Sequence, residues 1–197
     1  MCGIAGKLFF NVDRVVDFSD IKRMTDSIYH RGPDDEGHYI DRNIGLGFRR
    51  LSIIDIDHGH QPLSNSNKTI WITFNGEIYN FKELRHELIK KNYIFQTDSD
   101  TEVIVNLYEE YGENCVNHLR GMFAFVIWDQ RKKKLFGARD HLGIKPFYFY
   151  QDNHKFVWGS EIKAVKSSGD IETNLCLKSL DQYMTYGHIL KKESIYK

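Results

Sequence analysis

Short apolar runs and alternating apolar and polar stretches recur along this chain, and they predict many short β-strands and a few amphipathic helices. Strands are expected over residues 4–10, 38–40, 44–50, 70–75, 122–128, 134–138, 147–150 and 156–158. Helices are expected over 18–29, from 81 to 88, from 99 or 100 to 111, over 161–166 and over 177–184. Because strands outnumber helices and no repeat or linker is evident, the pattern favours an α+β fold of layered sheets flanked by helices.

Polar residues and glycine indicate where several of these elements begin and end. Ser19 is suited to cap the first helix, and Asn80 with Glu83 has the spacing of a capping box for the second. Gly112 follows the third helix as a stop signal. Residues 57–68 are polar and contain glycine and proline, so we expect them to form a loop.

Charge and composition exclude several classes of protein. The 197 residues carry 27 Lys and Arg against 27 Asp and Glu, so bulk electrostatic binding to nucleic acid or an anionic membrane is not expected. No apolar run approaches the roughly 20 residues that a membrane-spanning helix needs. Three scattered cysteines do not match a disulfide framework or a zinc site, and no secretory signal opens the chain. We therefore expect a cytoplasmic protein without a metal centre.

Cys2 is the most informative position for chemistry. Removal of Met1 would leave a cysteine with both a thiol and a free α-amine. An α-amine with an ordinary pKa of about 7.7–8.0 is partly unprotonated at neutral pH and can accept the thiol proton, which makes a nucleophile–base unit from one residue. The alternative is a small residue at a frayed terminus. Gly3 and Gly6 flank the start of an apolar strand and favour a terminus built into a sheet that a ligand can approach closely.

The opening MCGIAG is similar to that of the class II glutamine amidotransferases, and six later segments narrow the resemblance. They are Arg31–Asp34, Arg50–Ile53, Asn75–Asn80, Ser99–Glu102, Leu119–Ala124 and Arg139–Pro146. From residue 1 to about 165, the chain resembles the N-terminal glutaminase domain of glutamine-hydrolysing asparagine synthetases. The resemblance implies a four-layer αββα sandwich of the N-terminal-nucleophile hydrolase type. It also implies hydrolysis of the glutamine side-chain amide to glutamate and ammonia.

The resemblance assigns catalytic roles to three residues. Cys2 is the implied nucleophile, which forms a γ-glutamyl thioester that water resolves. The side-chain amide of Asn75 and the backbone N–H of Gly76 are the implied oxyanion hole, a pair of donors worth a large factor in rate. From the residues alone, an Asn-Gly pair at the end of a strand equally predicts a hairpin turn.

The resemblance also assigns a glutamine pocket. Arg50 is the implied clamp on the α-carboxylate, although the adjacent Arg49 is a competing choice. Asp100 is the implied partner of the α-ammonium, and it is also suited to cap a helix. Asp98 departs from the small residue usual in the family and competes with Asp100, while Glu77 is expected to line the pocket. Backbone and side-chain groups that complete the expected pocket belong to Leu51, Ser52, Ile53 and Ile54.

Other conspicuous residues are interpreted as structural. The segment Arg31–Asp34 and the pair Arg139–Asp140 are expected to hold loops near the pocket without a catalytic step. Cys115 and Cys176 fall in helical or apolar regions, where buried and unreactive thiols are common.

The expected partners follow from the same resemblance. L-Glutamine is the substrate, and no cofactor is needed for its hydrolysis. ATP and Mg are expected only in a synthetase domain, which receives the ammonia and is absent from this sequence, because no pyrophosphate-binding loop is found here. Residues 1–185 are expected to form the amidotransferase domain and 186–197 to start the connection, so the chain is read as a fragment, a truncated product or a subunit of a split enzyme. A homodimer through an exposed apolar patch is a further option.

Two alternative functions stay open at this point. One is an amidotransferase domain that serves another acceptor, such as a sugar phosphate or a phosphoribosyl group. The other is a catalytically silent module that binds an amino acid or a partner chain.

Overall fold

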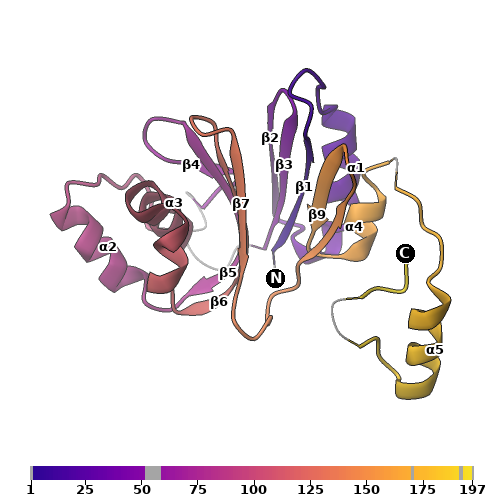
Figure 1. Ribbon diagram of the computed structural model, residues 1–197. Helices are drawn as coiled ribbons and strands as arrows, with labels where there is room; N and C mark the ends of the chain where they lie inside the picture. The colour runs from indigo at the N-terminus through magenta and orange to yellow at the C-terminus, as the bar shows by residue number, and fades with distance from the viewer. Residues whose placement is uncertain (1, 52–58, 170, 191–192, 197) are drawn as a thin grey trace.

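The computed structural model describes residues 2–51, 59–169, 171–190 and 193–196. Two antiparallel sheets lie face to face, and helices cover their outer surfaces (Figure 1). The first sheet has the order β2 (Asp35–Asp41), β3 (Ile44–Arg50), β1 (Gly3–Phe9), β9 (Lys155–Gly159) and β8 (Tyr148–Gln151). The second has the order β4 (Leu63–Ser64), β5 (Ile70–Ile78), β6 (Gly121–Asp129) and β7 (Lys134–Arg139).

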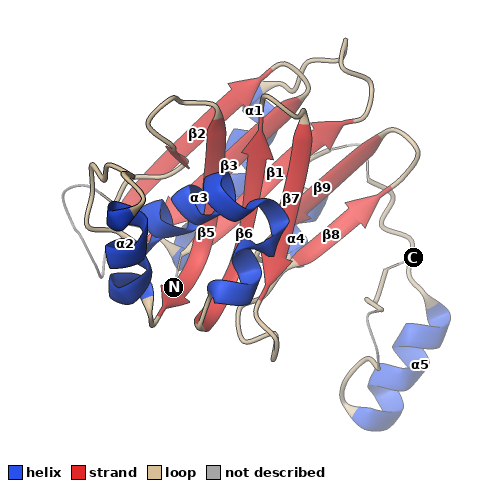
Figure 2. Cartoon of the chain, turned by 60° about the vertical axis from the view of Figure 1, so that its left-hand side comes forward, coloured by secondary structure: helices blue, strands red, loops and turns tan. Residues whose placement is uncertain are grey.

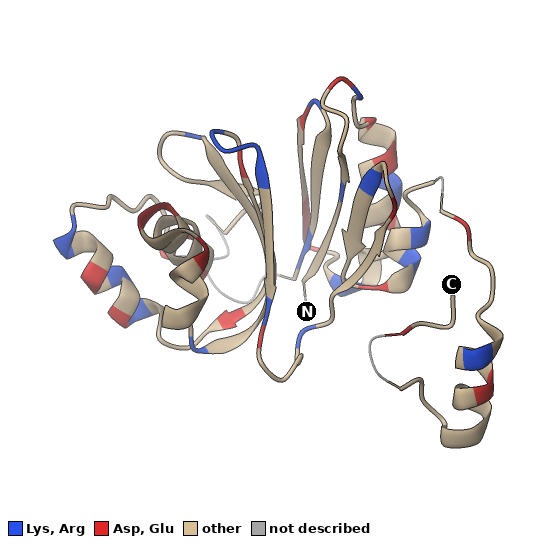
Figure 3. Ribbon diagram, viewed as in Figure 1, with Lys and Arg blue, Asp and Glu red and all other residues tan. Residues whose placement is uncertain are grey.

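The helices divide between the two sheets. Those on the first sheet are α1 (Phe18–Ser27) and α4 (Ile162–Lys166), and those on the second are α2 (Phe81–Lys90) and α3 (Asp100–Tyr111). Two 3-10 helices, η1 (Tyr29–Arg31) and η2 (Gly112–His118), follow α1 and α3. Both signs of charge are spread along α1 and α2 (Figure 3).

Three hydrophobic layers hold the elements together because each strand alternates its side chains between two buried faces. In the first sheet, Ala5 packs toward the helices with Ile21 of α1, whereas Ile4 belongs to the layer between the sheets. In the second, Phe125 packs toward α3, whereas Val126 lies between the sheets. The predicted four-layer αββα sandwich is confirmed.

Three details of the predicted elements differ in the structure, although Asn80 is the N-cap residue of α2 as predicted. Helix α1 is capped by Asp17, whose carboxylate accepts a hydrogen bond from the backbone N–H of Ser19 at 2.8 Å. Asn80 does not cap α2 with its side chain, which instead bridges the carbonyl of His118 and the N–H of Arg120. The stretch expected to be a loop contains the two-residue strand β4, which pairs with β5.

Strand β5 also differs from its prediction, because it runs through Asn75 and Gly76 to Ile78. Asn75 lies opposite Ala124 and Gly76 opposite Phe123 in β6. The Asn-Gly pair is therefore inside a strand, and the hairpin-turn reading is wrong. Gly112 ends α3 with a φ of 61°, as its sequence position predicted.

The last helix, α5 (Leu177–Tyr186), lies apart from the sandwich in both views (Figures 1 and 2). Its apolar side chains are largely exposed, as Leu177 and Met184 illustrate. Among the described residues, no helix combines the length and apolar character needed to cross a membrane.

Candidate functional site

Cys2 directly precedes β1, and its thiol lies against the end of β3. The sulfur is 3.5 Å from the backbone nitrogen of Leu51 and 3.7 Å from its carbonyl oxygen. Its side chain packs against the hydrophobic layer between the sheets and is only partly buried. The strand therefore holds the thiol at the open end of the sandwich, as a nucleophile requires, instead of deep in the core.

Strand alternation separates the two candidate arginines. Arg49 points toward α1, where its guanidinium donates to the carbonyl of Thr25 at 3.3 Å and forms ion pairs with Asp26 and with Glu36. Arg50 follows the alternation of Leu46 and Phe48, whose side chains lie between the sheets. The prediction of Arg50 over Arg49 fits this placement, because only Arg50 is on the face that Cys2 also occupies.

Asn75 occupies the corresponding face of the second sheet. Trp71 packs into the layer between the sheets, and strand alternation places Thr73 and Asn75 on the same face. Asn75 is 1% exposed, and its side-chain nitrogen has no hydrogen-bond partner among the described residues. A buried amide donor without a partner costs free energy unless something else accepts its hydrogen bond, so it marks a place for a ligand oxygen.

The backbone N–H of Gly76 points away from β6, toward the side of β5 where Gln61 and Asp100 lie. N–H groups two residues apart on a strand point the same way. The flanking N–H of Phe74 donates to the side chain of Gln61, and that of Ile78 donates to Asp100, so both point away from β6. Gly76 lies between them with the same direction. A side chain here is excluded by packing, because a Cβ atom would lie 2.3 Å from the carbonyl oxygen of Met122.

Asp100 is buried on this side of β5. It is the first residue of α3, and the capping role belongs to Ser99, whose hydroxyl accepts from the N–H of Thr101 at 3.1 Å. The carboxylate of Asp100 accepts from the N–H of Ile78 at 3.0 Å. Burial, with a smaller contribution from the charge of Glu77, raises the pKa of Asp100 to about 6.

Asp98, the competing carboxylate, is on the surface. Its side chain is 90% exposed and pairs with Arg85 at 3.2 Å. Glu77 is two residues after Asn75 on β5, so its side chain is on the same face of the strand, and it is exposed. Only Asp100 combines burial with closeness to Glu77, so the placement favours Asp100 as the group that faces a cationic ligand.

The two halves of the candidate site meet at one end of the sandwich. Strands β1 and β5 contact each other across the space between the sheets. Ser52, Ile53 and Ile54, which were also predicted to bind substrate, lie outside the described residues.

Arg31 is a residue that sequence reasoning treated only as loop support. Its Nε donates to the backbone carbonyl of Cys2 at 2.9 Å, and its Nη1 is 3.1 Å from Glu161. The loop role of Asp140 is also seen, because its carboxylate accepts from the N–H groups of Phe123, Ile144 and Lys145.

The other two thiols differ from each other. Cys115 is fully buried, and burial raises the pKa of its thiol to about 12, which confirms an unreactive core cysteine. Cys176 is not buried, contrary to its prediction, because it begins α5 outside the sandwich. Hydrogen bonds with Ser179 lower its pKa. Among the described residues, no three His, Cys, Asp or Glu side chains are grouped to hold a metal ion.

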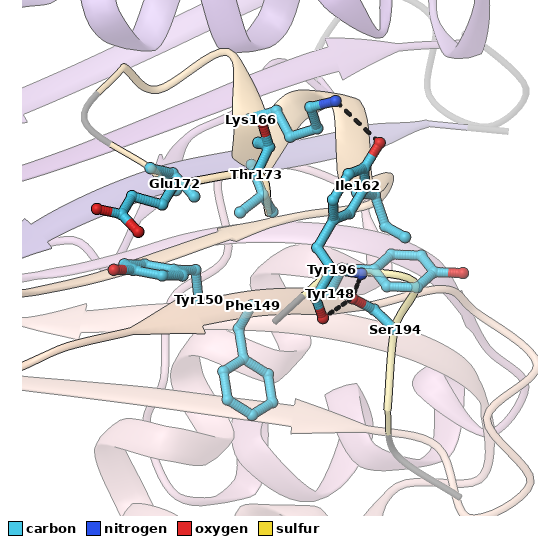
Figure 4. A pocket seen from close by; sticks show the side chains of 11 residues that line it. Tyr148, Phe149, Tyr150, Ile162, Lys166, Glu172, Thr173, Ser194 and Tyr196 are labelled. Carbon is cyan, nitrogen blue, oxygen red and sulfur yellow. Dashed lines mark hydrogen bonds between the residues drawn. The ribbon is translucent and has the colours of Figure 1, made fainter. Parts of the chain in front are cut away.

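A small cavity whose lining does not include Cys2 lies elsewhere in the molecule. It has a volume of about 90 Å³ and lies between β8, α4 and the C-terminal segment (Figure 4). Its lysine, Lys166, donates to the hydroxyl of Tyr196 at 3.0 Å, and Ser194 hydrogen bonds with the backbone of Tyr196. The polar groups of this cavity are thus used to hold the chain's own tail.

Comparisons with known proteins show the family of this chain. A family model described as "Glutamine amidotransferase domain" matches residues 1–197. Asparagine synthetase [glutamine-hydrolyzing] 1 of Bacillus subtilis is 48% identical over 191 residues, which cover 94% of this chain and 30% of that protein. Putative asparagine synthetase [glutamine-hydrolyzing] 2 of Methanocaldococcus jannaschii is 39% identical over 100% of this chain and 41% of its own length.

A solved structure shares the fold. Glutamine phosphoribosylpyrophosphate amidotransferase from Bacillus subtilis superposes with a TM-score of 0.70 at 21% identity, covering 85% of this chain and 44% of that one. At this identity the likeness concerns the fold. The chain spans about a third of the length of the first of its curated relatives.

Proposed function

We propose that this chain, which belongs to the glutamine amidotransferase domain family, hydrolyses the side-chain amide of L-glutamine. Cys2 is the nucleophile of this reaction. After removal of Met1, the α-amine of Cys2 takes the thiol proton, and the sulfur attacks the amide carbon. The tetrahedral intermediate collapses to a γ-glutamyl thioester as the amine returns the proton to the departing ammonia. Water then attacks the thioester and releases glutamate and the free thiol.

The observation that carries the proposal is the buried side-chain amide of Asn75, whose nitrogen has no partner among the described residues and which lies on the inner face of the second sheet, while Cys2 lies on the inner face of the first. Together with the N–H of Gly76, this amide supplies the two donors that a tetrahedral oxyanion needs. These donors are already oriented by β5, so no reorganisation is required when charge develops on the oxygen.

Arg50 and Asp100 bind the two charged ends of the substrate in this proposal. A guanidinium holds an α-carboxylate through two parallel hydrogen bonds, and a carboxylate in a buried site attracts an α-ammonium strongly. Glutamine is then held between the two sheets with its amide toward Cys2. Glu77 and Leu51 complete the part of the pocket that the structure describes.

Ammonia released here feeds asparagine formation in the proposed complete enzyme. The curated relatives are named as glutamine-hydrolysing asparagine synthetases and are about three times as long as the matched region. A synthetase part that uses ATP and Mg would receive the ammonia, connected through residues 186–197. A cytoplasmic location fits this biosynthetic role.

Replacement of Cys2 tests the hydrolase. We expect Cys2→Ala to abolish glutamate release from glutamine, while Cys176→Ser, which changes a thiol outside the sandwich, keeps it. The intact mass of the active protein should lack Met1. Normal glutamate release by Cys2→Ala, or full activity with Met1 retained, would contradict the mechanism, and binding of glutamine without turnover would favour a silent binding module.

A further inference from the structure

We propose that Glu161 is a positioning residue for the nucleophile and that it acts on Cys2 through Arg31. The inference rests on the proposed hydrolase function, and it concerns how the thiol and amine of Cys2 are held. Cys2 directly precedes β1 and is not part of the backbone pairing of the first sheet.

The backbone pairing of β1 with its neighbouring strands starts at Gly3, one residue after Cys2. The ladder between β1 and β3 begins at Gly3, opposite Arg49, and the ladder between β1 and β9 begins at Ala5, opposite Gly159. Cys2 therefore lies beyond both ladders. Its orientation depends on side-chain contacts, because a residue past the end of a strand has free backbone rotation unless its polar groups are held.

The residues that follow β9 supply those contacts. The backbone N–H of Ser160 donates to the carbonyl of Ile4 at 2.8 Å, and the N–H of Ile4 donates to the Ser160 hydroxyl at 2.9 Å. The next residue, Glu161, holds Arg31, which donates to the carbonyl of Cys2. Ser160 and Glu161 thus extend the support from Ile4 to Cys2.

Glu161 is also well suited to fix the guanidinium. Its carboxylate contacts His30 at 2.8 Å, Arg31 at 3.1 Å and Lys163 at 3.2 Å. Burial opposes ionisation, but the hydrogen bonds from these three groups prevail and lower the pKa of Glu161, so it is charged at neutral pH. The side chain of Arg31 is 9% exposed, so loss of this carboxylate would leave a buried cation with one ion-pair partner fewer.

A simple helix-capping role does not explain the carboxylate. Glu161 is the N-cap residue of α4, yet its side chain makes no capping hydrogen bond. It points instead to η1 and, through Arg31, to Cys2. The geometry therefore links the carboxylate to the nucleophile and not to the start of its own helix.

The experiment measures turnover and thiol reactivity in the same variants. We expect Glu161→Ala to lower kcat for glutamine hydrolysis about 10- to 100-fold with little change in KM, because a displacement near 1 Å can cost this much. Glu161→Gln keeps an oxygen that can accept from Arg31, so it should lose less. The rate of Cys2 alkylation by iodoacetamide, measured by peptide mass spectrometry, should be highest in the wild type, lower in Glu161→Gln and lowest in Glu161→Ala.

Two further variants separate positioning from general destabilisation. Glu113→Ala removes an ion-paired carboxylate from the other sheet's side, where it contacts Lys134, and should leave kcat and alkylation unchanged. Arg31→Ala combined with Glu161→Ala should lose no more activity than Arg31→Ala alone, because Glu161 acts through Arg31.

Several results would overturn the proposal. They are wild-type kcat and alkylation in folded Glu161→Ala, a change confined to KM, or additive losses in the double variant. These outcomes are distinct from failure of the hydrolase function itself, which would appear as wild-type protein without Cys2-dependent glutamate release. Cys2 alkylation still reports on positioning in that case.

Discussion

The two sheets present opposite kinds of polar chemistry at the site end of the sandwich. The first sheet's charged groups are tied into ion pairs, as Arg49 with Glu36 and Arg31 with Glu161 illustrate. The second sheet presents the buried Asn75 amide without a partner among the described residues, and a buried carboxyl, Asp100, with a raised pKa. The side of the first sheet thus holds the backbone of Cys2 and contributes Arg50 to the proposed pocket, and the side of the second sheet leaves hydrogen-bonding capacity for a ligand.

This difference indicates how the work is divided. A nucleophile must be held in one orientation, and the Arg31–Glu161 ion pair beside its backbone serves that purpose. Oxyanion and ammonium partners must meet charge that arrives with the substrate, so unmet donors and a poorly solvated carboxylate are more effective there than a completed network. Substitution of Asn75 should therefore affect function more than stability.

Asn75→Ala is the most severe test of the second sheet. We expect a fall in kcat of about 10²–10³-fold, because one of two oxyanion donors is lost. Loss of the amide nitrogen should by itself cost little stability, since that nitrogen has no hydrogen-bond partner among the described residues. Asn106→Ala is the control, because the side-chain nitrogen of Asn106 is also buried without a partner among the described residues but lies on α3. Steady-state kinetics and thermal unfolding of both variants measure the two effects.

Arg50→Lys and Arg49→Lys compare the two faces of one strand. We expect Arg50→Lys to raise KM for glutamine by about 10- to 100-fold, since lysine cannot hold a carboxylate through two parallel bonds. Arg49→Lys should mainly lower the unfolding temperature, because its contacts are to α1 and β2. A larger KM effect from Arg49→Lys would show that the assignment of the two faces is wrong.

Asp100→Asn should separate function from stability. The folded protein holds the Asp100 proton more tightly than the unfolded chain, so this group's contribution to stability is lost as pH rises from about 4 to about 6. At pH 7 the neutral amide avoids that cost, which is at most about 3 kcal/mol, and unfolding should require more denaturant. Glutamine KM should rise sharply, and the wild-type KM should itself rise below pH 6 as Asp100 is protonated.

Gly76→Ala gives the smallest expected effect. A Cβ atom would meet the carbonyl of Met122 at 2.3 Å, so we expect destabilisation of about 1–3 kcal/mol by overpacking. Gly137→Ala, where the nearest atoms are 3.7 Å away, should change stability far less. Chemical denaturation of the pair measures the difference, and equal stabilities would show that β6 can move aside.

Local sequence signals recovered most of the fold but missed features that depend on neighbours. The periodicities gave the strands and helices because each element buries one or two faces of its own. The end of β5 was placed at Asn75 because Asn-Gly is usually a turn, whereas pairing with β6 carries the strand to Ile78. Asn80 was read as a cap, but its side chain reaches η2, which is distant in sequence.

Sequence alone therefore determined which chemical groups this protein has: a thiol beside an α-amine once Met1 is removed, an Asn75-Gly76 pair at the end of a predicted strand, and two adjacent arginines. Only the tertiary structure decided which arginine faces the site, which aspartate is buried, and that Glu161 reaches Cys2 through Arg31. The physical reason is that identity is local, whereas facing, burial and pairing depend on strand register and on elements up to 159 residues apart in sequence, the separation of Cys2 from Glu161 (161 − 2).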